Sequence, residues 1–285
     1  MLIVAAALTA CAPIAEETDL SYDDRYGERT TMDLFYPEDS APEGRPGVLF
    51  IHGGGWHSGD KDAHRSEAVR LARSGYVTAT INYRLTPEGR FPAAFHDAQC
   101  ALAFFRLRGA AVGLDPDRVA VAGMSAGGHL VSLLGVATGH EELLPDCSVG
   151  TTGPPDAVIS AAGPQDLREY AWHERITEFV GGSPEEMPHA YELASPLDHV
   201  RAGAPPYLFL HGTFDVFVDV SDSERMRDAL TAEGNDARLL TLALGGHILN
   251  AGTDVGHLDG QIPLTAPEAW PAVADFLDAT LGSPP

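Results

Sequence analysis

The sequence predicts an α/β fold in which a mostly parallel central sheet carries helices on both faces. Continuous apolar runs such as 47–51 and 119–122 are typical of strands buried on both faces of a parallel sheet. Patterns typical of helices alternate with these runs along most of the chain. The 285 residues, 44% of them hydrophobic, can bury one large core. We therefore expect a single domain over residues 21–285.

The charge of the chain limits its partners. The formal net charge is −23, and Lys61 is the only lysine. Such an acidic surface repels nucleic acids and anionic membranes, so we expect no nucleic-acid partner. No apolar run reaches the roughly 18 residues that a membrane-spanning helix needs.

Residues 1–20 differ from the rest of the chain and are predicted to be an export signal and tether. Leu2 to Leu8 form a short apolar run typical of an export signal. Leu8-Thr9-Ala10-Cys11 resembles a bacterial lipobox, in which the cysteine becomes lipidated after cleavage, and 13–19 is expected to be a tether. The prediction is an exported protein, either periplasmic or anchored to the membrane at Cys11. The alternative is a chance apolar N-terminus on a cytoplasmic protein.

The first elements of the domain are expected at a sheet edge. Tyr22, Tyr26, Met32 and Leu34 lie at even spacing around Gly27. A period of two predicts an antiparallel hairpin over 21–37.

The following elements alternate as a doubly wound sheet requires. Apolar and β-branched runs predict strands at 47–51, 76–81, 119–122, 157–161, 207–210 and 241–244. Helical periodicity predicts helices at 65–74, 93–105, 126–137 and about 267–281. Residues 163–200 interrupt this order with aromatic residues in a mixed pattern, and an insertion there would overhang the site as a small lid.

A Gly-x-Ser-x-Gly turn follows the strand at 119–122. Ser125 is flanked by Gly123 and Gly127, with an apolar strand before it and a helix pattern after it. This context is that of a nucleophile elbow, in which the tight turn accepts only small neighbours and presents the serine Oγ. The alternative is a Gly-rich turn with an idle serine.

A second glycine-rich loop, His52-Gly53-Gly54-Gly55-Trp56, follows the strand at 47–51. Successive glycines let backbone N–H groups approach a developing oxyanion. Together with Ser125 the loop is of the HGGG type that lipases and esterases use. The backbone N–H groups of Gly54, Gly55 and Ala126 are the predicted oxyanion hole. Trp56 is expected to wall the acyl pocket, although a packing role is nearly as well supported.

An acid and a histidine follow in the order Ser–Asp–His. Asp215 comes after the strand at 207–210, and His247 comes after the strand at 241–244. A histidine can take the serine proton, and a buried carboxylate can orient its ring. Asp219 and His257 are rivals for these two roles. Asp219 is better explained as a charge at a helix N-terminus, and His257 lies in a Gly/Asp-rich loop.

Several ordered motifs make the chain similar to a known family. It resembles the α/β-hydrolase esterases, specifically the hormone-sensitive-lipase-like carboxylesterases and, more closely, the bacterial feruloyl/acetyl-xylan esterase (BD-FAE-like) type. The resemblance implies an α/β-hydrolase fold, ester hydrolysis, no metal and no organic cofactor. The motifs are His52–Trp56, Asn82–Leu85, Phe91–Ala94, Asp115–Val119 and Gly123–Leu130.

The residues and the resemblance together predict a serine carboxylesterase that acts through an acyl-enzyme. Its substrate would be a small-molecule or saccharide ester with a short acyl chain, such as an acetyl or feruloyl ester, and Trp172 is a further candidate for the pocket. The alternatives are an arylformamidase with the same three residues and a non-catalytic relative that binds a ligand. The histidines and cysteines lack metal-site spacing. Cys100 and Cys147 could pair if the protein is exported, although the sequence does not show that they approach.

Overall fold

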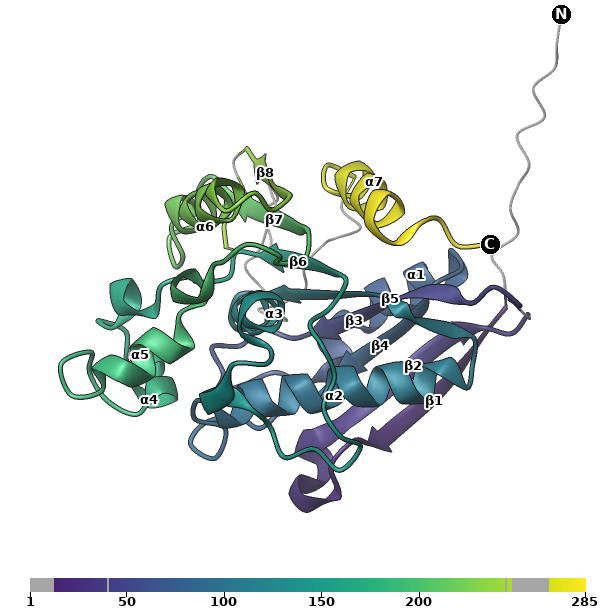
Figure 1. Ribbon diagram of the computed structural model, residues 1–285, viewed down its shortest axis with the longest axis horizontal. Coiled ribbons are helices and arrows are strands. Elements are labelled where there is room, and N and C mark those ends of the chain that lie inside the picture. Colours follow the sequence, from purple (N-terminus) through teal and green to yellow (C-terminus); the bar gives the residue numbers. More distant parts are fainter. Residues whose placement is uncertain (1–12, 40, 244, 248–266) are drawn as a thin grey trace, which may run out of the picture.

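The fold is a helix-flanked sheet, as predicted. The computed structural model describes residues 13–39, 41–243, 245–247 and 267–285. In this part of the chain eight strands form one sheet in the order β1-β2-β4-β3-β5-β6-β7-β8 (Figure 1). β1 and β2 are antiparallel to their neighbours, and the other six strands are parallel to one another.

The bounds of the elements follow the predicted alternation. The strands are β1 (Ile14–Ser21), β2 (Thr31–Pro37), β3 (Arg45–Ile51), β4 (Val77–Ile81), β5 (Leu114–Met124), β6 (Ala157–Ala161), β7 (Tyr207–Gly212) and β8 (Ala237–Leu242). The helices are α1 (Arg65–Arg73), α2 (Ala93–Ala110), α3 (Ala126–Ala137), α4 (Glu174–Val180), α5 (Pro188–Ala194), α6 (Val220–Ala232) and α7 (Trp270–Leu281). β8 begins at Ala237, four residues before the predicted strand at 241. The sequence did not reveal its first residues because this outer strand contains exposed residues such as Arg238 and lacks a continuous apolar run there.

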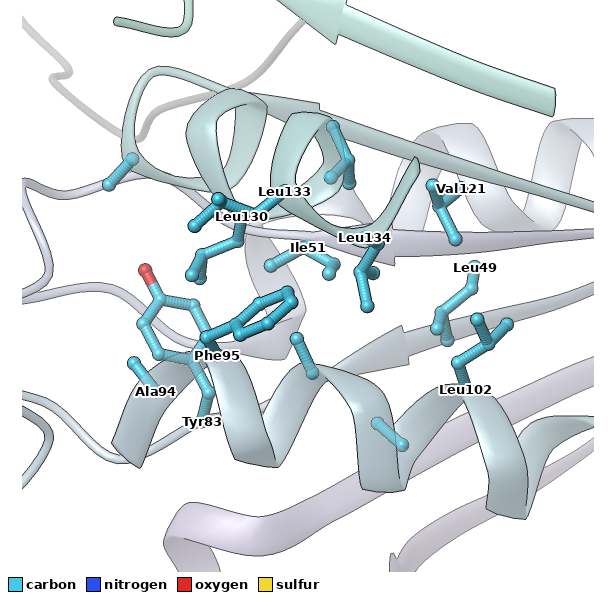
Figure 2. Packing of buried hydrophobic residues seen from close by; sticks show 14 of the residues in the cluster. Leu49, Ile51, Tyr83, Ala94, Phe95, Leu102, Val121, Leu130, Leu133 and Leu134 are labelled. Carbon is cyan, nitrogen blue, oxygen red and sulfur yellow. The ribbon is translucent and has the colours of Figure 1, made fainter. Parts of the chain in front are cut away.

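Each face of the sheet has its own apolar core. Leu49, Ile51 and Val121 pack against α2 and α3, and Figure 2 shows them with Phe95, Leu130 and their neighbours. The alternate residues of the same strands pack with α1 and α7 on the opposite face. Because side chains alternate along a strand, the stretches 48–51 of β3 and 119–122 of β5 are apolar at every position and serve both cores.

The predicted tether over 13–19 is wrong. Ile14–Ser21 forms β1, which pairs with β2 as an outer strand of the sheet. Its acidic residues hid the strand pattern, yet Glu16 and Glu17 form ion pairs with Arg65 and Arg108. Charged side chains on an edge strand protect it from pairing with other chains. The predicted hairpin is also shifted, because residues 24–30 form a 3-10 helix between β1 and β2 instead of a strand.

The 163–200 segment contains α4 and α5, which form a lobe beside α3 (Figure 1). Three of its aromatic residues are buried and anchor the lobe: Tyr170, Phe179 and Tyr191. Phe179 stacks on Trp56, with ring centroids 4.3 Å apart. The lobe is thereby fixed against the loop that follows β3.

Two further features of the described residues are a disulfide and the length of the helices. A disulfide joins Cys100 of α2 to Cys147, which lies on the segment before β6. Among the described residues, no helix is both long and apolar enough to span a bilayer. The predicted lipobox at Cys11 lies outside the described residues.

Candidate active site

Ser125 sits at the sharp turn between β5 and α3. Its backbone φ is 53°, an unusual value for a residue with a side chain, and its N–H donates to Ala161 O at 2.8 Å. Gly127 passes so close to β3 that a Cβ there would lie 2.0 Å from Ile51 O. Glycine is therefore required at this position, as the sequence pattern predicts, and the turn carries Ser125 at the carboxyl edge of the sheet.

The loop after β3 lies directly beside this turn. A Cβ on Gly53 would be 3.4 Å from the Cβ of Ser125. Gly54 has a φ of 107°, and Ala126 is the first residue of α3. The three predicted oxyanion-hole residues thus lie on the two segments that meet at Ser125. An amide N–H at a helix N-terminus favours a negative charge nearby.

His52 is the first residue of this loop and packs against Tyr83. Its ring stacks on that of Tyr83 with centroids 4.3 Å apart, and the Tyr83 hydroxyl donates to His52 O at 3.0 Å. Burial lowers the pKa of His52 to about 4. The ring is therefore neutral at neutral pH and adds no charge beneath the loop.

Asp215 and His247 extend the site from Ser125. His247 Nε2 lies 2.9 Å from Ser125 Oγ, and His247 Nδ1 lies 2.7 Å from Asp215 Oδ2. The Asp215 side chain is fully buried, whereas that of His247 is 17% exposed. These distances form one continuous hydrogen-bonded chain from serine to carboxylate.

The Asp215 carboxylate has more partners than the sequence suggested. Burial by itself raises the pKa of Asp215, but hydrogen bonds from His211 and His247 outweigh burial and hold that pKa well below its usual value. Its Oδ1 also accepts the N–H groups of Phe217 and Val218, both at 2.9 Å. The carboxylate therefore stays ionised and fixed in orientation.

Sequence reasoning missed His211. Its Nε2 lies 3.3 Å from Asp215 Oδ2 and 2.9 Å from Val218 O, and its Nδ1 lies 2.7 Å from Ser223 Oγ. The residue follows the apolar run 207–210 and is the penultimate residue of β7, four positions before Asp215. That placement after a strand was the same signal that selected Asp215, and it could have selected His211 too.

The rival acid is accounted for by the helix that it precedes. Asp219 is the N-cap of α6, and its carboxylate accepts the N–H of Ser221 at 2.9 Å. This is the helix-terminal role that the sequence indicated. The rival histidine, His257, lies outside the described residues.

The two tryptophans predicted for the pocket differ in their surroundings. Trp56 is 2% exposed and lies between Phe179 and His129, so it packs in the core. Trp172 is 73% exposed and contacts the ring of His173. The pocket roles of Trp56 and Trp172 stay predictions.

No group of three or more His, Cys, Asp or Glu side chains within the described ranges could hold a metal ion.

Comparison with known proteins shows which family the chain belongs to. The BD-FAE family model matches residues 32–230. The chain belongs to the BD-FAE family. The match extends from β2 to α6, and so includes Ser125, Asp215 and the loop after β3 but ends before His247.

Curated relatives of this BD-FAE chain are esterases by name. Esterase LipC of Mycobacterium tuberculosis is 32% identical over 257 residues, which cover 87% of this chain and 61% of LipC. The rice protein named probable isoprenylcysteine alpha-carbonyl methylesterase ICMEL1 is 32% identical over 229 residues, which cover 75% of this chain and 53% of that protein. The chain thus spans between about half and three fifths of the length of these relatives.

Solved structures share the fold at lower identity. A carbohydrate esterase from gut microbiota superposes with a TM-score of 0.77 at 22% identity, covering 93% of this chain and 96% of that one. A thermophilic esterase from Thermogutta terrifontis superposes with a TM-score of 0.73 at 24% identity, covering 98% and 95%. These neighbours establish the α/β-hydrolase fold for this BD-FAE member.

Proposed function

We propose that the protein is a serine carboxylesterase in which Ser125 is the nucleophile, His247 the general base and Asp215 the orienting acid. The observation that carries the proposal is the hydrogen-bonded chain from Ser125 Oγ through both His247 nitrogens to Asp215 Oδ2. Membership of the BD-FAE family and the esterase names of the relatives support the reaction class.

The geometry supports an acyl-enzyme mechanism. His247 Nε2 takes the proton of Ser125 Oγ as the oxygen attacks the ester carbonyl, and the backbone N–H groups of Gly54, Gly55 and Ala126 stabilise the resulting oxyanion. When the intermediate collapses, His247 returns the proton to the departing alcohol, which leaves the acyl group on Ser125. A water molecule then repeats the cycle and releases the acid. Asp215 stabilises the imidazolium that forms twice in this cycle.

The proposed substrates are small-molecule or saccharide esters with a short acyl chain, including acetyl or feruloyl esters of plant polysaccharides. Support comes from the BD-FAE match, from the relative named ethyl acetate hydrolase and from the carbohydrate esterase with the same fold.

We further propose that the protein is exported and anchored to a membrane through Cys11. The disulfide between Cys100 and Cys147 supports export, because disulfides form and persist in oxidising compartments. When the protein is expressed in a bacterium with its complete export signal, it should sediment with the membrane fraction. The variant Cys11→Ser should appear in the soluble fraction. Recovery of soluble protein with an unprocessed Met1 would contradict the anchor.

Four substitutions test the proposed function. Ser125→Ala and His247→Ala should each lower kcat on p-nitrophenyl acetate by about 10⁶, and Asp215→Ala by about 10⁴. Asp219→Ala is the matched control, because it removes a carboxylate four residues away that caps α6, and its kcat should stay within about tenfold of wild type. A fully active Ser125→Ala enzyme would refute the proposal. A crippled Asp219→Ala with an active Asp215→Ala would refute only the assignment of the acid.

A further inference from the structure

One arginine of the lobe lies against the loop beside Ser125. A Cβ built on Gly55 would be 2.8 Å from Arg175 Cδ and 3.0 Å from Arg175 Nη1. Gly55 is two residues beyond Gly53, which contacts the turn of Ser125. Two residues span at most about 7 Å of chain. The Arg175 guanidinium therefore lies against the far end of the short loop whose near end contacts the turn of Ser125.

The backbone that carries Arg175 is firmly held. Arg175 and Phe179 are four residues apart on α4 and so share a face of that helix. Phe179 is fully buried between Trp56 and His129, and its backbone oxygen accepts the N–H of Phe91 at 2.8 Å. Because Phe179 anchors α4, the Cα of Arg175 is held in place beside the loop of Gly55. Only rotation about the side-chain bonds of Arg175 can move its guanidinium.

The charge of Arg175 has no partner in the part of the chain that the structure describes. No hydrogen bond or ion pair of its guanidinium occurs there, although Glu174 and Glu178 lie on the same helix. Several other arginines are held by carboxylates: Arg84 by Asp97, Arg168 by Asp166 and Asp198, and Arg225 by Asp222 and Glu169. The chain has 41 acidic and 18 basic residues, so the surroundings of Arg175 are acidic overall while its own guanidinium is unpaired.

We propose that Arg175 determines specificity by binding a carboxylate of the substrate, so that the enzyme favours esters that carry a second, anionic acid group. Guanidinium binds carboxylate through paired, charge-assisted hydrogen bonds. A surface with a net charge of −23 repels anionic substrates, and a local unpaired cation beside the reacting ester offsets that repulsion where it matters. The inference rests on the proposed esterase function and adds the class of substrate.

Matched ester pairs test this inference. The monoethyl esters of succinate, glutarate and adipate would be compared with ethyl butyrate, valerate and hexanoate, in which a methyl group replaces the carboxylate. Hydrolysis is followed by pH-stat for wild type, Arg175→Gln, Arg175→Lys and the control Arg73→Gln, which removes an exposed arginine from α1. The quantity measured is the ratio of kcat/KM between the members of each pair.

In at least one pair, Arg175→Gln should lower the ratio of kcat/KM for the anionic ester to that for the neutral ester by about tenfold. Most of this loss should be a higher KM for the anionic ester. The kcat/KM for the neutral ester should stay within about threefold of the wild-type value. Arg175→Lys should keep part of the ratio, and Arg73→Gln all of it. Molar NaCl should reduce the difference in this ratio between wild type and Arg175→Gln, because the guanidinium is exposed and its attraction is screened.

Ratios that are the same in wild type and Arg175→Gln for all three pairs would overturn the inference, as would an equal loss on both members of each pair. Activity of Ser125→Ala on both members would instead show that the proposed function is wrong, so the two failures are distinguishable.

Discussion

At the scale of single residues, the Asp215 carboxylate has the most hydrogen-bond partners described for any of the candidate catalytic groups. Its buried carboxylate accepts two backbone N–H groups and lies within 3.3 Å of a second histidine, His211. Because every oxygen is held, Asp215 can keep the His247 ring in one orientation. We therefore expect His211 to be a positioning residue that acts through Asp215.

We expect His211→Ala to lower kcat by about tenfold and to leave KM unchanged, because the reacting groups remain but the carboxylate loses one partner. His211→Gln, which can still donate a hydrogen bond, should recover most of that loss. Steady-state kinetics on p-nitrophenyl acetate measure both effects. If the alanine variant keeps wild-type kcat while folded, His211 serves only the packing of β7.

At the scale of elements, the disulfide joins α2 to the segment before β6. The two cysteines are 47 residues apart in the sequence, so the bond closes a long loop of the unfolded chain. A loop of this length corresponds to about 4 kcal/mol of stabilisation in the chain-entropy account.

The double variant Cys100→Ala, Cys147→Ala should lose about 2–4 kcal/mol of unfolding free energy in urea, while kcat/KM stays unchanged. Wild type unfolded in the presence of dithiothreitol is the control and should show the same loss. Two free thiols in the native wild-type protein would contradict the pairing.

The sequence predicted elements whose pattern is local. The elbow at Ser125 and the glycines after β3 are determined by close approaches that leave few residue choices, so their motifs were readable. β1 was missed because its acidic side chains are neutralised by arginines distant in sequence, such as Arg108. His211, the direction of the Trp56 ring and the position of Arg175 depend on which segments meet in space, and no local pattern records that.

At the scale of the whole molecule, buried neutral histidines make the stability depend on pH. Burial lowers the pKa of His52 and of His129 to about 4. The unfolded chain binds their protons near the usual value of about 6.5. Acidification below that value therefore favours the unfolded state, and the loss continues until the pH reaches the folded-state pKa.

Between pH 7 and pH 5 each of these histidines should remove about 2 kcal/mol of unfolding free energy. His129→Gln, which can keep a hydrogen bond to Ala194 O, should reduce this loss by about that amount. Urea unfolding at the two pH values, followed by tryptophan fluorescence, measures the difference. An identical loss in the variant and in wild type would show that other groups govern the dependence.

The central claim is that Ser125 is the nucleophile of an ester hydrolase, and covalent labelling tests it most directly. The protein would be treated with diethyl p-nitrophenyl phosphate, which transfers its phosphoryl group to an activated serine and releases p-nitrophenol. Intact and peptide mass spectrometry would then locate the adduct. We predict one diethylphosphoryl group per chain, on Ser125, and a loss of esterase activity in proportion to labelling. Full inactivation with the label on another residue, or full activity with Ser125 labelled, would contradict the account.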